Sequence, residues 1–298
     1  MSPPILSPQW LRQATGQDII TFFKNVPVSL KAHDNYAELE KTQHLLEKMI
    51  KWLDNNPRDV DRRLADKIKD TLLHTPGITN KSFKHAYLNF SCYINTVLYV
   101  AEEEYLDDNA ISLLLKTLKN RHSDGGRNMF IDQDFLRAAI ECKAAEGEHM
   151  LFGSFKWDWG KKDLFNNVVD RAFGIYNHAQ HWYVVCIDFQ ARQVFAGDSI
   201  DRGMPEHVRR AIVQWLVSVL PVTNEFSQPS DSLKGWTLHK LDVPQQGGDS
   251  GSCGLVAANA IECILDPRMP PWSRQKRVAH RMRLLNMLMS DNPFVSTY

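Results

Sequence analysis

The chain has 298 residues, of which 43% are hydrophobic and 23% are charged, and its 35 basic residues balance its 35 acidic residues. A chain of this length can hold a main domain of roughly 200 residues together with an N-terminal extension. The balanced charge argues against a nucleic-acid partner and against binding to an anionic membrane.

Cysteine usage and the N-terminal sequence indicate the compartment. The cysteines form no CxxC pair and stand at irregular spacings, at Cys92, Cys142, Cys186, Cys253 and Cys263. Such an odd, irregular set fits neither a disulfide framework nor a zinc ribbon. The first residues do not resemble a secretion signal, and no apolar run approaches the ~18 residues of a membrane span. We therefore expect an intracellular protein of the nucleus, the cytoplasm or both.

Helical periodicity marks the N-terminal part of the chain. Within residues 35–73, apolar residues recur at helical intervals among charged ones, with a break at Asn55-Asn56-Pro57. This pattern predicts two amphipathic helices. We expect a helical hairpin that packs on the rest of the protein, and a partner-binding module is the alternative. Because Thr75-Pro76-Gly77 is a stop signal, we place a helical extension at residues 1–80 and the main domain at residues 81–298.

The rest of the chain alternates between helices and strands. β-Branched and aromatic residues mark the strands, and apolar residues at helical spacing mark the helices. In chain order the pattern predicts a helix with an acidic start and a buried run at 110–115, a helix at 132–142, strands at 182–189 and 193–196 joined by a tight turn, a helix at 205–220, a strand at 236–241 and a helix at 255–265. This order predicts an α+β protein.

A glycine-rich loop leads to Cys253. Residues 243–254 run directly into an apolar helix, which places Cys253 at a helix N-terminus. There the unpaired N–H groups and the helix dipole favour a thiolate over a thiol. The glycines let the backbone come close to a substrate carbonyl, and Gln246 can place its side-chain amide where an oxyanion develops. The alternative is a buried, unreactive cysteine at the start of a core helix.

His181 and Asp198 are candidates for the two further groups that a thiol nucleophile needs, a base and a residue that orients it. His181 directly precedes the first of the two strands, and Asp198 closes the second, seventeen residues later. If these strands pair as an antiparallel hairpin, the Asp198 carboxylate lies near the His181 ring. The alternative is a surface histidine together with an Asp198-Ser199 pair that only caps the following turn.

These motifs together resemble the ubiquitin-like-protein-specific protease family, which processes SUMO and related modifiers. The motifs are His181-Trp182 before a hydrophobic strand, then Gly197-Asp198-Ser199, Pro244-Gln245-Gln246 and Cys253-Gly254, in the family's chain order and at similar separations. Upstream, Tyr105-Leu106-Asp107-Asp108 resembles the family's Trp-Leu-Asn-Asp helix start. The similarity extends over roughly residues 80–290.

The resemblance implies a papain-like cysteine protease fold, in which helices flank a central mixed or antiparallel sheet. It also implies a cysteine peptidase that needs no metal or organic cofactor. It assigns Cys253 as nucleophile, His181 as base, Asp198 as orienting residue and Gln246 as oxyanion donor. Trp182 would then lie over a narrow tunnel for the C-terminal Gly-Gly of the substrate. The expected partner is SUMO or another ubiquitin-like protein, with its conjugates, and we expect a monomer without nucleic-acid or membrane partners.

The same resemblance assigns substrate contacts and reveals three departures. Asp108 stands at the family's second acidic position and would help to hold the substrate tail. Tyr105 replaces a tryptophan, Ser252 replaces the common aspartate before the cysteine, and the loop before Cys253 is one residue longer. Because of that extra residue, Gln245 remains an alternative oxyanion donor.

Three other interpretations are open. A relative that binds a ubiquitin-like protein without catalysis, or a protease for an unrelated protein, would share these motifs in part. His178 and His181 have the spacing of metal ligands but lack a third ligand at a diagnostic interval, and we interpret His178 as a loop residue. The basic residues at 274–277 and 281–283 can bind acidic partners or act as a nuclear address, but we interpret them as the solvated face of a terminal helix.

Overall fold

The computed structural model describes residues 10, 13–25, 34–55, 62–74, 81–84, 91–93, 100, 105–122, 126–144, 158–166, 169–220, 235–247, 251–291 and 295–296. The chain divides into two compact units, Met1–Leu113 with Gln275–Tyr298 (unit 1) and Leu114–Arg274 (unit 2). The expected boundary near residue 80 stays a prediction. None of the helices in the described ranges has the length together with the apolar character of a membrane span.

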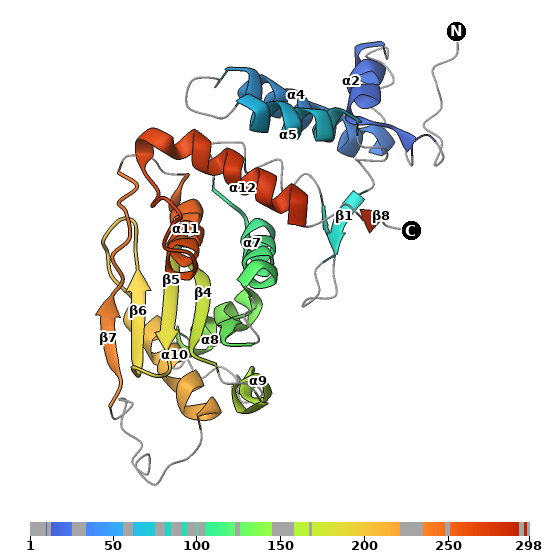
Figure 1. The fold of residues 1–298 in the computed structure, drawn as a ribbon. Coiled ribbons are helices and arrows are strands. Elements are labelled where there is room, and N and C mark those ends of the chain that lie inside the picture. Colours follow the sequence, from blue (N-terminus) through green and yellow to red (C-terminus); the bar gives the residue numbers. More distant parts are fainter. Residues whose placement is uncertain are drawn as a thin grey trace. The chain divides into compact units, whose positions relative to one another are not determined.

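Unit 1 contains amphipathic helices (Figure 1). They are α2 (Gly16–Asn25), α4 (Asp34–Asn55), α5 (Arg62–His74) and α12 (Arg277–Asp291). Helices α2, α4 and α5 pack against one another, and α12 packs on α5. Their apolar stripes form a core, whose fully buried side chains include Ile19, Leu46, Met49, Ile68 and Leu72. The prediction of two helices that separate after Asn55 is confirmed.

Helix α2 was not predicted, although Ile19, Phe22 and Phe23 recur at helical spacing and are buried, and its start carries a further sequence signal. Asp18 Oδ2 accepts the Thr15 N–H at 2.8 Å, and Thr15 Oγ1 accepts the Asp18 N–H at 3.1 Å. This reciprocal pair is a variant of the capping box. The helix then approaches α5 closely, since a Cβ on Gly16 would lie 2.3 Å from the Leu72 carbonyl oxygen.

Unit 1 also contains a small antiparallel sheet in the order β2–β1–β8. Its strands are β1 (Lys81–Lys84), β2 (Ser91–Tyr93) and β8 (Val295–Ser296). Ser82 pairs with Tyr93 on one side and with Val295 on the other. Such short strands carry too little of a period-2 pattern to be predicted from the sequence.

A mixed sheet forms the centre of unit 2 (Figure 1). In the described residues it has five strands, β3 (Asn128–Phe130), β4 (Arg171–His178), β5 (His181–Asp188), β6 (Gln193–Gly197) and β7 (Thr237–Lys240), in this order. Strands β4, β5 and β6 are antiparallel, and β3 and β7 join the sheet parallel to their neighbours. Ala179 and Gln180, both with positive φ, form the tight turn between β4 and β5.

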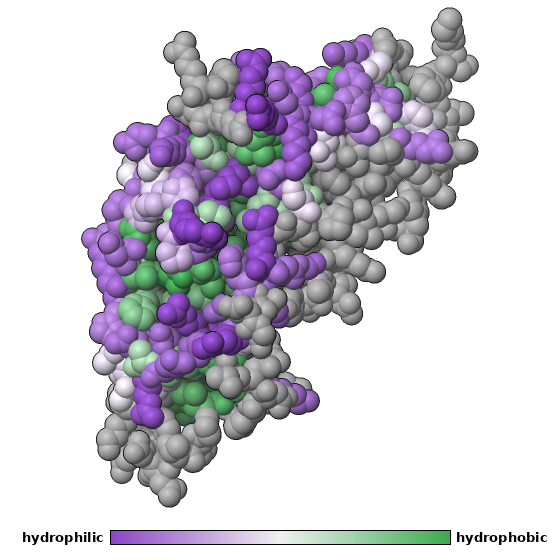
Figure 2. Space-filling model, viewed as in Figure 1, coloured by the Kyte–Doolittle hydropathy of each residue, from purple (hydrophilic) through white to green (hydrophobic). Residues whose placement is uncertain are grey.

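Helices pack on both faces of this sheet. On one face, α8 (Gln133–Ala144) and α10 (Glu206–Val219) share a core with the strands. On the other face, α11 (Cys253–Leu265) packs on β4 and β5. Strand β5 is buried on both sides, which explains its continuous hydrophobic run. In the view of Figure 2, hydrophobic residues of unit 2 (green) gather over the sheet among hydrophilic ones (purple).

The remaining described helices are one that crosses the boundary between the two units and two short ones. Helix α7 (Asp108–His122) begins in unit 1 and continues into unit 2, and its start is capped by Asp107, whose Oδ1 accepts the Ala110 N–H at 2.8 Å. The others are α9 (Lys161–Asn166) and the 3₁₀ helix η5 (Arg274–Lys276). The acidic start of α7 and its buried run agree with the prediction.

The solvated face predicted for the terminal helix is wrong at one residue. Arg281 of α12 is only 1% exposed, and one of its guanidinium nitrogens donates to the Val100 carbonyl oxygen at 2.8 Å. A buried guanidinium needs such an acceptor. This acceptor could not be predicted from the sequence, because Val100 is remote from Arg281 in the chain. The basic residues at 274–276 are exposed, as expected.

Candidate active site

His181 and Asp198 meet at one end of the β5–β6 pair. Val184 of β5 pairs with Gly197 of β6, so Asp198 leaves the sheet at the end where His181 enters it. His181 Nε2 lies 2.9 Å from Asp198 Oδ1, and both side chains are only 5% exposed. An ionised carboxylate only accepts hydrogen bonds, so Nε2 carries the proton and Nδ1 is the basic nitrogen. The predicted approach of the two groups is confirmed.

Asp198 also organises the turn that follows it. Its Oδ1 accepts the Ile200 N–H at 2.9 Å, and its Oδ2 accepts the N–H groups of Arg202 and of Gly203, the latter at 3.0 Å. The interpretation of Asp198 as a turn cap is therefore correct as well. The two arrangements are compatible, because the turn fixes the carboxylate in the orientation that faces His181.

Burial decides the protonation of His181. It lowers the pKa of His181 below the usual value of 6.5, whereas the hydrogen bond and the charge of Asp198 raise this pKa and the charge of Arg202 lowers it. Because the net direction is downward, the ring is neutral at pH 7. A neutral imidazole can accept a proton from a nearby acid.

Cys253 is the first residue of α11 and has no exposed surface. The predicted place at a helix N-terminus is confirmed. Tyr183 contacts the histidine of the candidate site. Its ring meets the His181 ring edge-on, with 4.6 Å between the ring centroids. Burial raises the pKa of the Tyr183 hydroxyl, the charge of Asp198 raises it further, and the charge of Arg202 lowers it. The tyrosine thus lies against the histidine of the His181–Asp198 pair.

Gln246 and Gln245 are anchored to the same dipeptide, Asp198-Ser199, in different ways. The Gln246 side chain is buried, and Ser199 Oγ donates to Gln246 Oε1 at 3.0 Å. The Gln246 N–H in turn donates to the Ser199 carbonyl oxygen at 3.0 Å. Gln245 is exposed and its Nε2 donates to the Asp198 carbonyl oxygen at 3.3 Å. The sequence placed Ser199 in the Gly197-Asp198-Ser199 motif and in the following turn, but it indicated no contact between Ser199 and Gln246.

The predicted substrate-binding residues lie in different units. Trp182 is on β5 in unit 2, next to His181, and is 2% exposed. Tyr105 and Asp108 belong to unit 1, just before and at the first residue of α7, and both are exposed, Tyr105 to 50%. Their roles in substrate binding stay predictions.

His178 is not a loop residue, contrary to the prediction. It ends β4, pairs with His181 across the hairpin, and its ring lies 4.7 Å from the ring of His207 in α10. Its strand was missed because β4 includes Gly174 and ends in polar residues. Among the described residues, no group of three or more histidine, cysteine or acidic side chains is arranged to hold a metal ion.

Cys186 differs from Cys253 although both thiols are buried. It lies in the middle of β5, and burial raises its pKa to about 12. At this pKa the thiol stays protonated at neutral pH, and a protonated thiol is a poor nucleophile.

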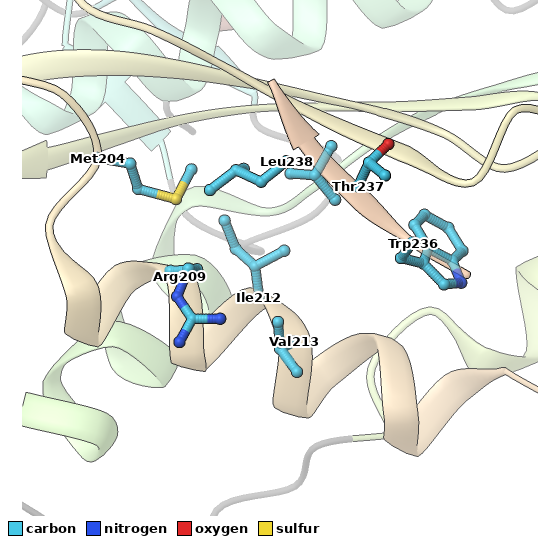
Figure 3. A pocket seen from close by; sticks show the side chains of 8 residues that line it. Met204, Arg209, Ile212, Val213, Trp236, Thr237 and Leu238 are labelled. Carbon is cyan, nitrogen blue, oxygen red and sulfur yellow. The ribbon is translucent and has the colours of Figure 1, made fainter. Parts of the chain in front are cut away.

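A pocket of about 100 Å³ in unit 2 includes none of these residues. It lies between α10 and strands β6 and β7, and Figure 3 shows Ile212 and Val213 of the helix across from Leu238 and Trp236. Apolar side chains make up most of its lining, and Arg209 supplies a charged group. The nucleophile and base candidates therefore belong to a different part of unit 2.

Comparisons with known proteins agree with this fold. A SUMO protease Ulp1 structure with an oxidised catalytic cysteine has 14% identity and a TM-score of 0.55, over 78% of this chain and 96% of that chain. The Ulp1 protease domain in complex with Smt3, the yeast orthologue of SUMO, has 15% identity and a TM-score of 0.55 with the same coverage. The Ulp1-like SUMO protease domain of Chaetomium thermophilum has 14% identity and a TM-score of 0.52, over 78% of this chain and 94% of that chain.

These likenesses confirm the predicted α+β fold with a mixed sheet flanked by helices. A search among curated proteins gave no match. The model of the Ulp1 protease family, C-terminal catalytic domain, matches residues 104–289, within the range expected from the sequence. This match covers more than half of the chain, and the protein therefore belongs to the Ulp1 protease family.

Proposed function

We propose that this chain is a cysteine protease that cleaves after the C-terminal Gly-Gly of SUMO or another ubiquitin-like modifier, in precursors, in conjugates or in both. Membership of the Ulp1 protease family supports this. The observation that carries the proposal is the buried contact of 2.9 Å between His181 and Asp198, in a unit where Cys253 begins a helix. A base with an orienting carboxylate and a cysteine at a helix N-terminus are the parts of a thiol protease.

In the proposed reaction, His181 Nδ1 takes the proton of the Cys253 thiol, and the thiolate attacks the carbonyl carbon of the last glycine. The Gln246 amide and the Cys253 N–H stabilise the oxyanion. When the tetrahedral intermediate collapses, His181 gives its proton to the leaving amine, and a thioester remains on Cys253. Water, deprotonated by His181, then hydrolyses the thioester and restores the thiol. Asp198 holds His181 in one tautomer throughout.

Burial of these groups supports a narrow substrate. Cys253 has 0% exposed surface, Trp182 has 2% and His181 has 4%. An extended Gly-Gly tail lacks side chains and is the thinnest peptide that can reach such a nucleophile. We propose that the tail passes under Trp182, with Tyr105 and Asp108 as further contacts.

The remaining expectations about partners and location form part of the proposal. The partner is SUMO or another ubiquitin-like protein with its conjugates, and the enzyme works as a monomer without metal, organic cofactor, nucleic acid or membrane. It acts inside the cell, in the nucleus, the cytoplasm or both. The odd and irregular set of cysteines motivates this location.

The test uses the full chain and its Cys253→Ala variant with SUMO, related modifiers and ubiquitin, each carrying an electrophile at its C-terminus. Mass spectrometry of the intact protein should show a covalent adduct with at least one modifier, and Cys253→Ala should show none. Complexes that form without an adduct would indicate a silent binder. If the folded protein neither binds nor reacts with any modifier, the proposal is wrong and an unrelated protein substrate becomes the better hypothesis.

A further inference from the structure

Ser199 determines how the Gln246 side chain presents its two ends. Gln246 carries a carbonyl oxygen, which repels a developing oxyanion, and an NH₂ group, which stabilises it. An amide that rotates freely presents the wrong atom for part of the time. In this structure Ser199 Oγ donates to Gln246 Oε1 at 3.0 Å. The oxygen is therefore directed toward Ser199, and the NH₂ group is turned away from Ser199.

The backbone and burial reinforce this orientation. The Ser199 carbonyl oxygen accepts the Gln246 N–H at 3.0 Å, so the two residues share two hydrogen bonds. Ser199 is 3% exposed and Gln246 is 6% exposed, so water has little access to compete for either group. A buried hydroxyl without its acceptor would carry a desolvation penalty, which opposes rotation of the amide.

Gln245 is held by the same dipeptide but through the other end of its amide. Its Nε2 donates to the Asp198 carbonyl oxygen at 3.3 Å, so the group that would stabilise an oxyanion already has a partner. The side chain is also exposed. Of the two glutamines, Gln246 is the one whose NH₂ group is directed away from its anchor.

We propose that Ser199 is a positioning residue that fixes the Gln246 amide with its NH₂ group toward the oxyanion, and that Gln246 rather than Gln245 is the donor. Asp198 and Ser199 then form one rigid link, because Asp198 orients the base through its carboxylate and Ser199 orients the oxyanion donor through its hydroxyl. The kinetic part of this inference rests on the proposed protease function, whereas the hydrogen bond itself does not.

The kinetic test compares Ser199→Ala and Ser199→Thr with the wild type, with a SUMO or ubiquitin-like substrate that carries a C-terminal fluorogenic amide. Ser199→Ala should lower kcat by about 10–100-fold with KM within twofold. Ser199→Thr keeps the hydroxyl and should recover most of this loss. In the Gln246→Ala background, Ser199→Ala should cause no further loss, because the group that it positions is absent. Independent, multiplying losses would overturn the proposal.

Alkylation of Cys253 by iodoacetamide separates this role from a general disruption of the site. This reaction forms no oxyanion, so Ser199→Ala should alkylate within twofold of the wild-type rate. A large fall in that rate, together with a fall in melting temperature, would show that Ser199 is only a structural residue.

A spectroscopic readout decides the inference even if no substrate is cleaved. The Gln246 side-chain NH₂ signals in a ¹H–¹⁵N spectrum of the full chain can be assigned from their loss in Gln246→Ala. They should move in Ser199→Ala and stay close to their wild-type positions in Ser199→Thr. Unchanged signals in Ser199→Ala would refute the hydrogen bond, whereas moved signals in a protein that cleaves nothing would contradict only the protease proposal.

Discussion

Asp198 Oδ1 accepts a hydrogen bond from His181 Nε2–H, and the same carboxylate also accepts hydrogen bonds from three backbone N–H groups of the turn at residues 200–203. One side chain therefore fixes the orientation of a histidine and the path of the chain after β6. Because all four donors are directed at one buried carboxylate, we expect a change of this residue to affect both the proposed chemistry and the fold.

Asp198→Asn should reduce both activity and stability. The amide nitrogen of asparagine cannot accept a hydrogen bond, so either orientation of the new side chain loses two of the four donors. If the nitrogen faces His181, the ring also loses its fixed tautomer. We expect kcat/KM to fall by about 10³–10⁴-fold and the free energy of unfolding to fall by roughly 1–3 kcal/mol. Steady-state kinetics and urea unfolding measure the two effects.

Asp201→Asn is the matched control for this change. Asp201 lies in the same turn, but its side chain is 61% exposed and its partner is Lys240. Asparagine also tolerates the positive φ of 59° at this position. Unfolding free energy should change by no more than about 0.5 kcal/mol, with activity near that of the wild type. Equal losses in the two variants would refute a special role of Asp198.

The pH dependence follows from the lowered pKa of His181. Burial is the largest cause of this shift. The ring therefore stays neutral at pH values just below 6.5, the usual pKa of histidine. The acid limb of kcat/KM should therefore have its midpoint below pH 6.5. Asp198 raises this pKa, so the residual activity of Asp198→Asn should show a limb at still lower pH. Steady-state rates measured from pH 4.5 to 8 give the pH profile of kcat/KM. An acid limb with its midpoint above pH 6.5 would contradict His181 as the base.

The free energy of unfolding should also depend on pH through His181, and it should fall as the pH is lowered. A histidine whose pKa is lower in the folded than in the unfolded state binds fewer protons when folded. Its contribution is complete above pH 6.5 and declines as the pH falls from 6.5 towards the folded pKa. The melting temperature of the wild type should fall over this window more than that of His181→Gln, which lacks the titrating ring.

The sequence predicted the elements that carry strong local patterns. Strands β5 and β6, with their run of β-branched and aromatic residues, were found, and their antiparallel pairing was enough to bring His181 towards Asp198. Strand β4 was missed because Gly174 interrupts its apolar run. The structural reason for this glycine is long-range, since a Cβ there would lie 3.1 Å from both Leu136 Cδ2 and Val185 Cγ1.

Contacts between distant side chains were beyond sequence reasoning. Ser199 and Gln246 are separated by 47 positions, and no periodicity links a hydroxyl with an amide at such a distance. The burial of Arg281 was hidden for the same reason, because its acceptor is Val100. Residue types near Cys253 suggested the proposed chemistry, whereas our proposal of Gln246 over Gln245 rests on hydrogen bonds that the sequence does not show.

Thiol alkylation should distinguish Cys253 from Cys186. With iodoacetamide at pH 7.5, Cys186 should remain unmodified in the folded protein because its pKa is raised to about 12 by burial. Cys253 should be alkylated, and the rate should fall by at least about tenfold in His181→Ala, which lacks the proton acceptor. Peptide mapping after a time course measures both sites. Preferential modification of Cys186 would contradict the assignment of Cys253 as nucleophile.

A substitution at Gly197 should show whether the packing at the end of β6 holds Asp198 in position. A Cβ at this residue would lie 2.6 Å from Cγ1 of Val184 and 2.6 Å from Cγ1 of Val243. Gly197→Ala should therefore lower the free energy of unfolding by about 1–3 kcal/mol and displace the neighbouring Asp198, so that kcat falls by about tenfold or more.

Gly174→Ala provides the comparison within the same sheet. Its new Cβ would also be tight, at 3.1 Å from two side chains, but it lies in β4 and does not adjoin Asp198. It should lower stability by a smaller amount and leave kcat unchanged at a temperature where both variants are folded. If Gly197→Ala lost stability but kept full activity, the end of β6 would have enough freedom to hold Asp198 without the close packing at Gly197. The position of the carboxylate would then depend on the turn at residues 200–203 alone.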